Sequence, residues 1–262
     1  MKKLLRMALL GTALVSSMAQ AKDWSAIRVG IEAAYPPFNE LTPDKKIVGF
    51  DKDIADAICS YLKTKCTYVI QDWDGMIPAL ISRRFDTIIS SMAATDERKL
   101  KIAFTRPYYN TPAFFLIKKG SNLNVNSPEA MKGKRIGVQS ATNYQNFLNE
   151  IYQKAGSDVV AYQTIDQMFM DLSAGRLDAA LSGSIEDDTF LKSKDGNGFM
   201  MAGKPLSDPK WFGEGIAIAV RKEDEDLRKR LDDAVAALHK NGTYDTIRKK
   251  YFAYDIWPKS GQ

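Results

Sequence analysis

The stretch that decides the fold is residues 135–181, which read RIGVQSATNYQNFLNEIYQKAGSDVVAYQTIDQMFMDLSAGRLDAAL. Short apolar runs alternate in it with longer segments that have apolar residues at helical spacing. We expect strands at 135–138, 158–162 and 178–181, and helices at 143–155 and 165–175. Strands that alternate with helices on this scale form parallel sheets covered by helices.

The same alternation fills the rest of the chain. The other expected strands are 27–31, 66–70, 86–90, 113–117 and 214–220. The other expected helices are 51–63, 75–84, a short one capped by Thr95, 223–239 and 244–251. Because the pattern restarts after residue 117, the sequence predicts an α/β protein with two lobes.

The N-terminus is typical of a secretory signal peptide. Lys2, Lys3 and Arg6 precede a short apolar run, and Ala19-Gln20-Ala21 ends it. The apolar run is too short to span a bilayer. We expect cleavage after Ala21 and a periplasmic location, and the alternative is a buried N-terminal helix.

Composition and charge exclude several classes of protein. The chain is 45% hydrophobic, 26% charged and 10% aromatic, which excludes disordered, collagen-like and multi-span membrane proteins. The formal charge is +5, and removal of the three cations within residues 1–21 leaves 5 − 3 = +2. So small a charge gives little electrostatic reason to bind nucleic acid.

Cys59 and Cys66 are the two cysteines of the chain. An even number in an exported protein predicts a disulfide, worth about 2–3 kcal/mol for so short a loop. Two free buried thiols are the alternative. His239 is the single histidine, so the sequence predicts no metal site, and we expect no cofactor.

Two similar loops follow predicted strands, where α/β sheets bind ligands. They are Ser90–Thr95 and Gln139–Asn143, and each leads into a helix whose first N–H groups favour an anion. Arg98 follows the first loop and suits a carboxylate. Alternatively, Arg98 neutralises the neighbouring Asp96 or Glu97.

An acid and two aromatic residues also lie at predicted strand ends. Glu32 and Tyr35 follow the first strand, and Trp73 lies between a strand and a helix. An acid between aromatic rings suits a cation on an apolar stem. Core packing is the alternative for each ring.

Several motifs resemble one family. Gly49–Ile58 (GFDKDIADAI) matches a signature of the family 3 extracellular solute-binding proteins of polar amino acid ABC transporters, apart from Lys52, where the family has an apolar residue. The likeness runs over about residues 25–255 and is nearest to the lysine/arginine/ornithine- and histidine-binding branch, with opine-binding relatives close. The other matching motifs are YPPF (35–38), DWDGMIP (72–78), AGRLDA (174–179) and NGTYD (241–245).

The resemblance implies the type II periplasmic-binding-protein fold, in which each lobe has a central, mostly parallel sheet with flanking helices. Lobe 1 would be residues 22–109 and 216–262, and lobe 2 would be 114–206. Residues 110–113 and 207–215 would be hinge crossovers. The spacing of the two cysteines matches the disulfide of that branch, and we expect a monomer.

The resemblance also implies roles for single residues. Arg98 would clamp the ligand's α-carboxylate, assisted by Ser91, the backbone of Ala93, and Asn143. Tyr35 and Trp73 would sandwich the ligand's stem. Glu32 would face its distal cation, with Ser90 and Gln139 beside it.

Two positions depart from the family pattern. The aspartate that binds the ligand's α-ammonium falls at Gly183, and a serine that commonly helps falls at Ala93. Either the ligand lacks a free α-ammonium or carries it substituted, or Glu186, Asp187 or water takes over.

The resemblance predicts a binding protein, not an enzyme. It would capture a cationic amino acid or derivative, such as arginine, ornithine, lysine, histidine, an opine or a guanidino compound, and deliver it to an inner-membrane ABC permease. The alternative is a cyclohexadienyl (prephenate/arogenate) dehydratase that uses Glu186 as its acid. A sensor domain is a third class.

Overall fold

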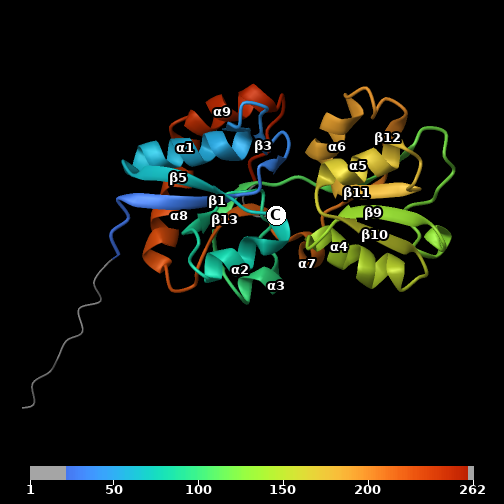
Figure 1. Ribbon diagram of the computed structural model, residues 1–262, viewed down its shortest axis with the longest axis horizontal. Coiled ribbons are helices and arrows are strands. Elements are labelled where there is room, and N and C mark those ends of the chain that lie inside the picture. The colour runs from blue at the N-terminus through green and yellow to red at the C-terminus, as the bar shows by residue number, and fades with distance from the viewer. Residues whose placement is uncertain (1–21, 259–262) are drawn as a thin grey trace, which may run out of the picture.

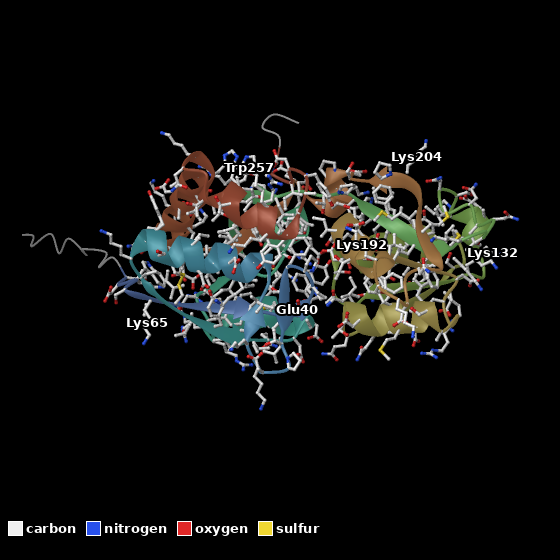
Figure 2. All side chains as sticks on the ribbon, turned by 90° about the horizontal axis from the view of Figure 1, so that it is seen from above. Glu40, Lys65, Lys132, Lys192, Lys204 and Trp257 are labelled. Carbon is white, nitrogen blue, oxygen red and sulfur yellow. A yellow bond between two sulfur atoms is a disulfide. The ribbon has the colours of Figure 1, made fainter. Side chains whose placement is uncertain are left out.

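The computed structural model describes residues 22–258 and shows two α/β lobes side by side along the long axis (Figure 1). Seen from above, Lys65 and Lys132 lie toward opposite ends of that axis (Figure 2). The predicted signal peptide, with its cleavage site after Ala21, lies outside the described residues. Among the helices of residues 22–258, none is both long and apolar enough to cross a membrane.

Lobe 1 is built on a five-stranded sheet with the order β5-β1-β6-β13-β7. These strands are β5 (Lys65–Ile70), β1 (Ala26–Ile31), β6 (Thr87–Ile88), β13 (Ile216–Val220) and β7 (Ala103–Tyr109). Helices α1 (Phe50–Leu62), α8 (Glu225–Lys240) and α9 (Thr243–Tyr251) pack together on one face, and α2 (Met76–Ile81) contacts β1 and β6. The remaining elements are the turn η1 (Trp73–Gly75), α3 (Asp96–Lys99) and a small sheet of β2 (Ala34–Tyr35), β3 (Asn39–Leu41) and β4 (Ile47–Val48).

Lobe 2 has a second five-stranded sheet with the order β10-β9-β11-β8-β12. Its strands are β10 (Asp158–Tyr162), β9 (Arg135–Gln139), β11 (Ala179–Gly183), β8 (Ala113–Lys118) and β12 (Phe199–Leu206). Its helical elements are α4 (Asn143–Leu148), the π-helical turn η3 (Asn149–Gln153), α5 (Ile165–Ser173), α6 (Ser184–Leu191) and the turn η2 (Glu129–Met131). Ile136 and Val138 of β9 pack with Phe147 and Leu148 of α4, as the alternation of side chains along a strand requires.

The predicted α/β fold with two lobes is confirmed, and in each mixed sheet one strand runs against the other four. In lobe 1, β13 runs antiparallel to both of its neighbours, and in lobe 2 β8 does the same. Each of these strands directly follows a passage of the chain from the other lobe, so it enters its sheet without a covering helix before it. The passages lie between β7 and β8, and between β12 and β13, where α7 (Pro209–Phe212) sits.

The prediction from sequence missed β7, β12 and α6, as well as the short elements β2, β3, β4 and α7. β7 and β12 are edge strands that contain Pro107 and Pro205, and a proline weakens a strand pattern. Helix α6 buries the acids Glu186 and Asp187, so its polar residues do not mark its exposed face. The predicted helix 143–155 is α4 continued by the π-helical turn η3.

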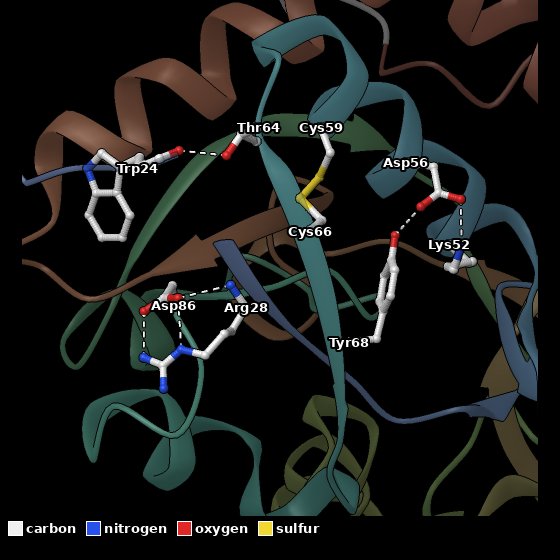
Figure 3. Close-up of a disulfide and its surroundings, with 9 residues drawn as sticks. All are labelled: Trp24, Arg28, Lys52, Asp56, Cys59, Thr64, Cys66, Tyr68 and Asp86. Atoms are coloured by element: carbon white, nitrogen blue, oxygen red, sulfur yellow. Dashed lines mark hydrogen bonds and ion pairs between the residues drawn. A yellow bond between two sulfur atoms is a disulfide. The ribbon is translucent and has the colours of Figure 1, made fainter. Parts of the chain in front are cut away.

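The predicted disulfide between Cys59 and Cys66 is confirmed. It joins the last turn of α1 to β5 (Figure 3). Nearby, Arg28 of β1 pairs with Asp86 just before β6, with 2.8 Å between Nη2 and Oδ1. These links fix the covering helix and the neighbouring strand ends of lobe 1.

Candidate functional site

A cavity lies between the lobes, where the carboxyl ends of β1, β6 and β9 face one another. It brings together eight of the nine predicted ligand-binding residues: Glu32, Tyr35, Trp73, Ser90, Ser91, Ala93, Gln139 and Asn143. The ninth, Arg98, lines an adjoining pocket together with Trp73 and Asn143. The topology explains the gathering, because parallel strands end at the same edge of their sheet.

Glu32 is the buried acid at the end of β1, and its side chain spans the gap between the lobes. Its Oε1 accepts a hydrogen bond of 2.6 Å from Nε2 of Gln139, and its backbone N–H donates to the Ser90 hydroxyl at 2.9 Å. Glu32 is only 6% exposed, and burial raises its pKa to about 7 although the bond from Gln139 lowers it. An acid held in this way gains most from a cation that enters the cavity.

A second buried acid, Asp51, braces the site from behind. Its carboxylate accepts hydrogen bonds from Asn39 Nδ2 (2.8 Å), Ser91 Oγ (2.8 Å) and Tyr108 Oη (2.6 Å). Ser91 has a left-handed backbone with φ 53°, and this network holds it there. Because the hydroxyl hydrogen of Ser91 is donated to Asp51, this hydroxyl has no hydrogen left to donate to a ligand.

Arg98 lies beneath the ring of Trp73. Its guanidinium carbon is 5.2 Å from the ring centroid, and its Nη1 donates to the carbonyl of Ala93 at 3.1 Å. Burial lowers its pKa to about 10, so it stays cationic at neutral pH. Its neighbours in α3 have other partners: Asp96 pairs with Lys99, and Glu97 accepts from Asn146. Among the described residues no salt bridge joins Arg98 to either acid, although the charge of Glu97 acts to raise the pKa of Arg98.

On the other side of the cavity, lobe 2 contributes the loop between β9 and α4. Thr142 caps α4 by accepting from the N–H of Gln145 at 3.1 Å, and Asn143 donates to the carbonyl of Trp211 at 3.2 Å. The indole N–H of Trp73 donates across the gap to the carbonyl of Ala141 at 3.1 Å. The molecule is thus closed, with direct hydrogen bonds between the lobes at the cavity.

The structure adds lining residues that the list of predicted site residues lacks. Glu186 of α6 lines the cavity at 4% exposure, and burial raises its pKa to about 7. The others are Tyr109, Asn110, Thr111, Thr142, Tyr144, Phe212 and Ile216. Thr142 lies within the predicted loop and Tyr144 directly follows it, so the loop was the sequence signal that could have indicated both. Phe212 comes from the second passage between the lobes, where the sequence holds no such signal. Within residues 22–258, no three His, Cys, Asp or Glu side chains gather as metal ligands would.

The sequence was compared with protein families and with known proteins. Residues 27–254 match the model of the bacterial extracellular solute-binding proteins, family 3. The chain is 45% identical to the L-arginine-binding protein of Pseudomonas aeruginosa strain PAO1, over 98% of this chain and 99% of that protein. It is 35% identical to the lysine/arginine/ornithine-binding periplasmic protein of Escherichia coli K12, over 98% of each chain.

Among solved structures, an ancestral arginine-binding protein bound to arginine superposes with a TM-score of 0.80 at 34% identity. The superposition covers 87% of this chain and 99% of the ancestral protein.

Proposed function

The chain belongs to the bacterial extracellular solute-binding proteins of family 3, and from this premise we propose that it captures a cationic amino acid in the periplasm for an ABC transporter. Residues 110–113 and 207–215 serve as the hinges on which the lobes close. The ligand is arginine, ornithine, lysine, histidine or a guanidino derivative, and the partner that receives it is an inner-membrane permease. The relatives named for arginine and for lysine, arginine and ornithine support this ligand class.

The observation that carries the proposal is the acidic, aromatic cavity. Glu32 and Glu186 face a space that Tyr35 and Trp73 also line. Buried carboxylates attract a cation strongly because little water screens them, and aromatic rings favour a cation further. An anionic or apolar ligand would leave both acids uncompensated.

In this proposal, Arg98 binds the ligand's carboxylate while Glu32 faces its distal cation. Ala93 and Asn143 lie beside the carboxylate, and Ser90 and Gln139 beside the cation. Ser91 also lies beside the carboxylate, but its hydroxyl hydrogen is donated to Asp51, so its role there is to position the loop. Closure then follows from differential contact: the ligand touches both lobes only in the closed state, so binding shifts the population toward closure. Micromolar affinity corresponds to about −8 kcal/mol, which a charge clamp and an aromatic pair can supply together.

Native mass spectrometry of the purified protein identifies any ligand that co-purifies. Calorimetry with L-arginine, L-ornithine, L-lysine, L-histidine, agmatine and octopine then ranks the candidates. We expect at least one cationic amino acid to bind at micromolar strength or tighter. If none binds, the proposal is wrong.

A second candidate function has one feature in its favour. Glu186 is a buried acid whose pKa lies near 7, as a general acid in a closed cavity requires. The charge of Glu32, however, disfavours a dianionic substrate such as prephenate. Incubation with prephenate tests this candidate: release of phenylpyruvate that Glu186→Gln abolishes would establish the dehydratase, and the binding proposal predicts no release.

A further inference from the structure

Gly183 ends β11 and precedes the first turn of α6, and its backbone does not need a glycine. Its φ of −73° and ψ of 151° are open to any residue. The reason is space: a Cβ at this position would lie 2.3 Å from Oε2 of Glu186 and 3.1 Å from its Cδ. Gly183 therefore leaves room for the carboxylate of Glu186, and the two positions act as a pair.

The carboxylate of Glu186 is buried and incompletely satisfied. Among the described residues, its Oε2 has no hydrogen-bond partner. Burial raises its pKa, hydrogen bonds from its own backbone N–H and from the hydroxyl of Tyr35 lower it, and the charge of Asp51 raises it. Its own charge in turn adds to burial in raising the pKa values of Tyr144 and Asp187. None of these groups is a cation. A buried carboxylate oxygen without a donor is costly, so a donor that enters from the cavity is strongly favoured.

Asp187, the next residue, does not compete for this role. It is fully buried, it accepts from the hydroxyl of Ser182, and it is not among the residues that line the cavity. Of the two acids at the start of α6, Glu186 alone presents its carboxylate to a ligand.

We propose that Glu186 binds the α-ammonium group of the ligand and that Gly183 is the companion substitution that admits it. The inference rests on the proposed function and extends it, because it requires a ligand with a free α-ammonium. Opines and other N-substituted derivatives would place a bulky group against Glu186. The α-ammonium contact thus comes from α6 rather than from the end of β11.

The test pairs one variant with two ligands. L-Arginine and 5-guanidinopentanoate share the carboxylate and the guanidinium, and only arginine has the α-ammonium. Glu186→Gln should weaken L-arginine about 10- to 100-fold, the effect expected for a lost hydrogen bond between charged groups. It should change the affinity for 5-guanidinopentanoate less than about threefold. Calorimetry measures both, and circular dichroism verifies that the variant is folded.

Gly183→Ala provides a second route to the same result. The added methyl group displaces the end of the Glu186 side chain, so arginine binding should weaken while the analogue is spared. Gly198→Ala is the matched control, because a Cβ there meets nothing within 4 Å. We expect wild-type affinity from it.

The outcomes separate the two proposals. If the wild-type protein binds no cationic amino acid, the proposed function fails. If it binds arginine and Glu186→Gln binds arginine equally well, or loses both ligands equally, only the role of Glu186 is overturned.

Discussion

The two lobes have the same strand order but prepare the cavity differently. In lobe 1 the loop after β6 contains Ser91 with φ 53°, and in lobe 2 the loop after β9 contains Ala141 with φ 56°. The buried Asp51 holds Ser91 by a hydrogen bond of 2.8 Å. Ala141 has no polar side chain, and its N–H donates to Oε1 of Gln145 at 2.7 Å. The loop of lobe 1 is therefore held by a buried carboxylate, and the loop of lobe 2 is held by the side chain of Gln145 in the helix that follows it.

The difference extends to which side chains each lobe places at the cavity. Lobe 1 places Glu32, Tyr35 and Trp73 at the cavity and Arg98 at the adjoining pocket, whereas lobe 2 places Gln139, Asn143 and Glu186 at the cavity. We infer that lobe 1 makes the first encounter and that lobe 2 adds its contacts on closure. Variants in lobe 1 should then alter recognition, and variants at the lobe 2 surface should alter closure.

The largest expected effect is that of Arg98→Ala. Removal of the guanidinium should weaken L-arginine binding by about 2–5 kcal/mol, the range for truncating one partner of a buried charge pair. Arg83→Ala, which removes an exposed lobe 1 arginine paired with Glu223, serves as the control for calorimetry. An unchanged dissociation constant for Arg98→Ala would mean that the guanidinium under Trp73 does not reach the ligand.

Removal of the disulfide tests whether the stability of lobe 1 is separate from its recognition of the ligand. Cys59→Ser/Cys66→Ser should lower the free energy of unfolding by about 2–3 kcal/mol. Neither cysteine lines the cavity, so the affinity for arginine should change less than about twofold in the folded variant. Denaturant titration and calorimetry measure the two quantities. A loss of affinity comparable to the loss of stability would contradict the separation.

The stability of the protein should depend on pH through Glu186 of lobe 2. Burial raises its pKa from 4.5 to about 7, so the folded protein without ligand binds more protons than the unfolded chain between these values. Its contribution to stability is therefore present below pH 4.5 and is lost as the pH rises toward 7. Glu186→Gln should raise the stability of the ligand-free protein at pH 8 by about 1–3 kcal/mol and leave it nearly unchanged at pH 4.5.

Thermal unfolding at both pH values measures this effect, with Glu150→Gln on the surface of lobe 2 as the control. A gain of the same size at both pH values would show that Glu186 is not the titrating group.

These comparisons also show what the sequence could predict. Strand 158–162 was placed to the residue, because its apolar run is bounded by turn residues on both sides. Eight of the nine predicted site residues line one cavity, because their positions at strand ends follow from the order of strands and helices.

The rest depends on tertiary packing. Helix α6 was missed because Glu186 and Asp187 occupy buried positions that a pattern reserves for apolar residues. The placement of Arg98 under Trp73 depends on the packing and rotamers of two side chains within lobe 1, which sequence spacing does not encode. The pairing of Gly183 with Glu186 is likewise visible only in three dimensions, because it depends on how the Glu186 side chain turns back over the bend from β11 into α6.

The smallest expected effect on affinity is that of Asn146→Ala, which tests closure of the lobes separately from recognition of the ligand. Asn146 of α4 donates to Oε2 of Glu97 across the lobes at 2.9 Å. Neither residue lines the central cavity, although both line the adjoining pocket of Arg98. Asn146→Ala removes one exposed hydrogen bond that exists only in the closed state, so the affinity for arginine should fall by about 0.5–1 kcal/mol. The loss should appear as a faster dissociation rate in stopped-flow fluorescence, with the association rate unchanged. Glu97→Gln keeps an oxygen that accepts the same bond, so it should lose less. An association rate that falls with an unchanged dissociation rate would place lobe 2 in the first encounter and reverse the assignment of roles.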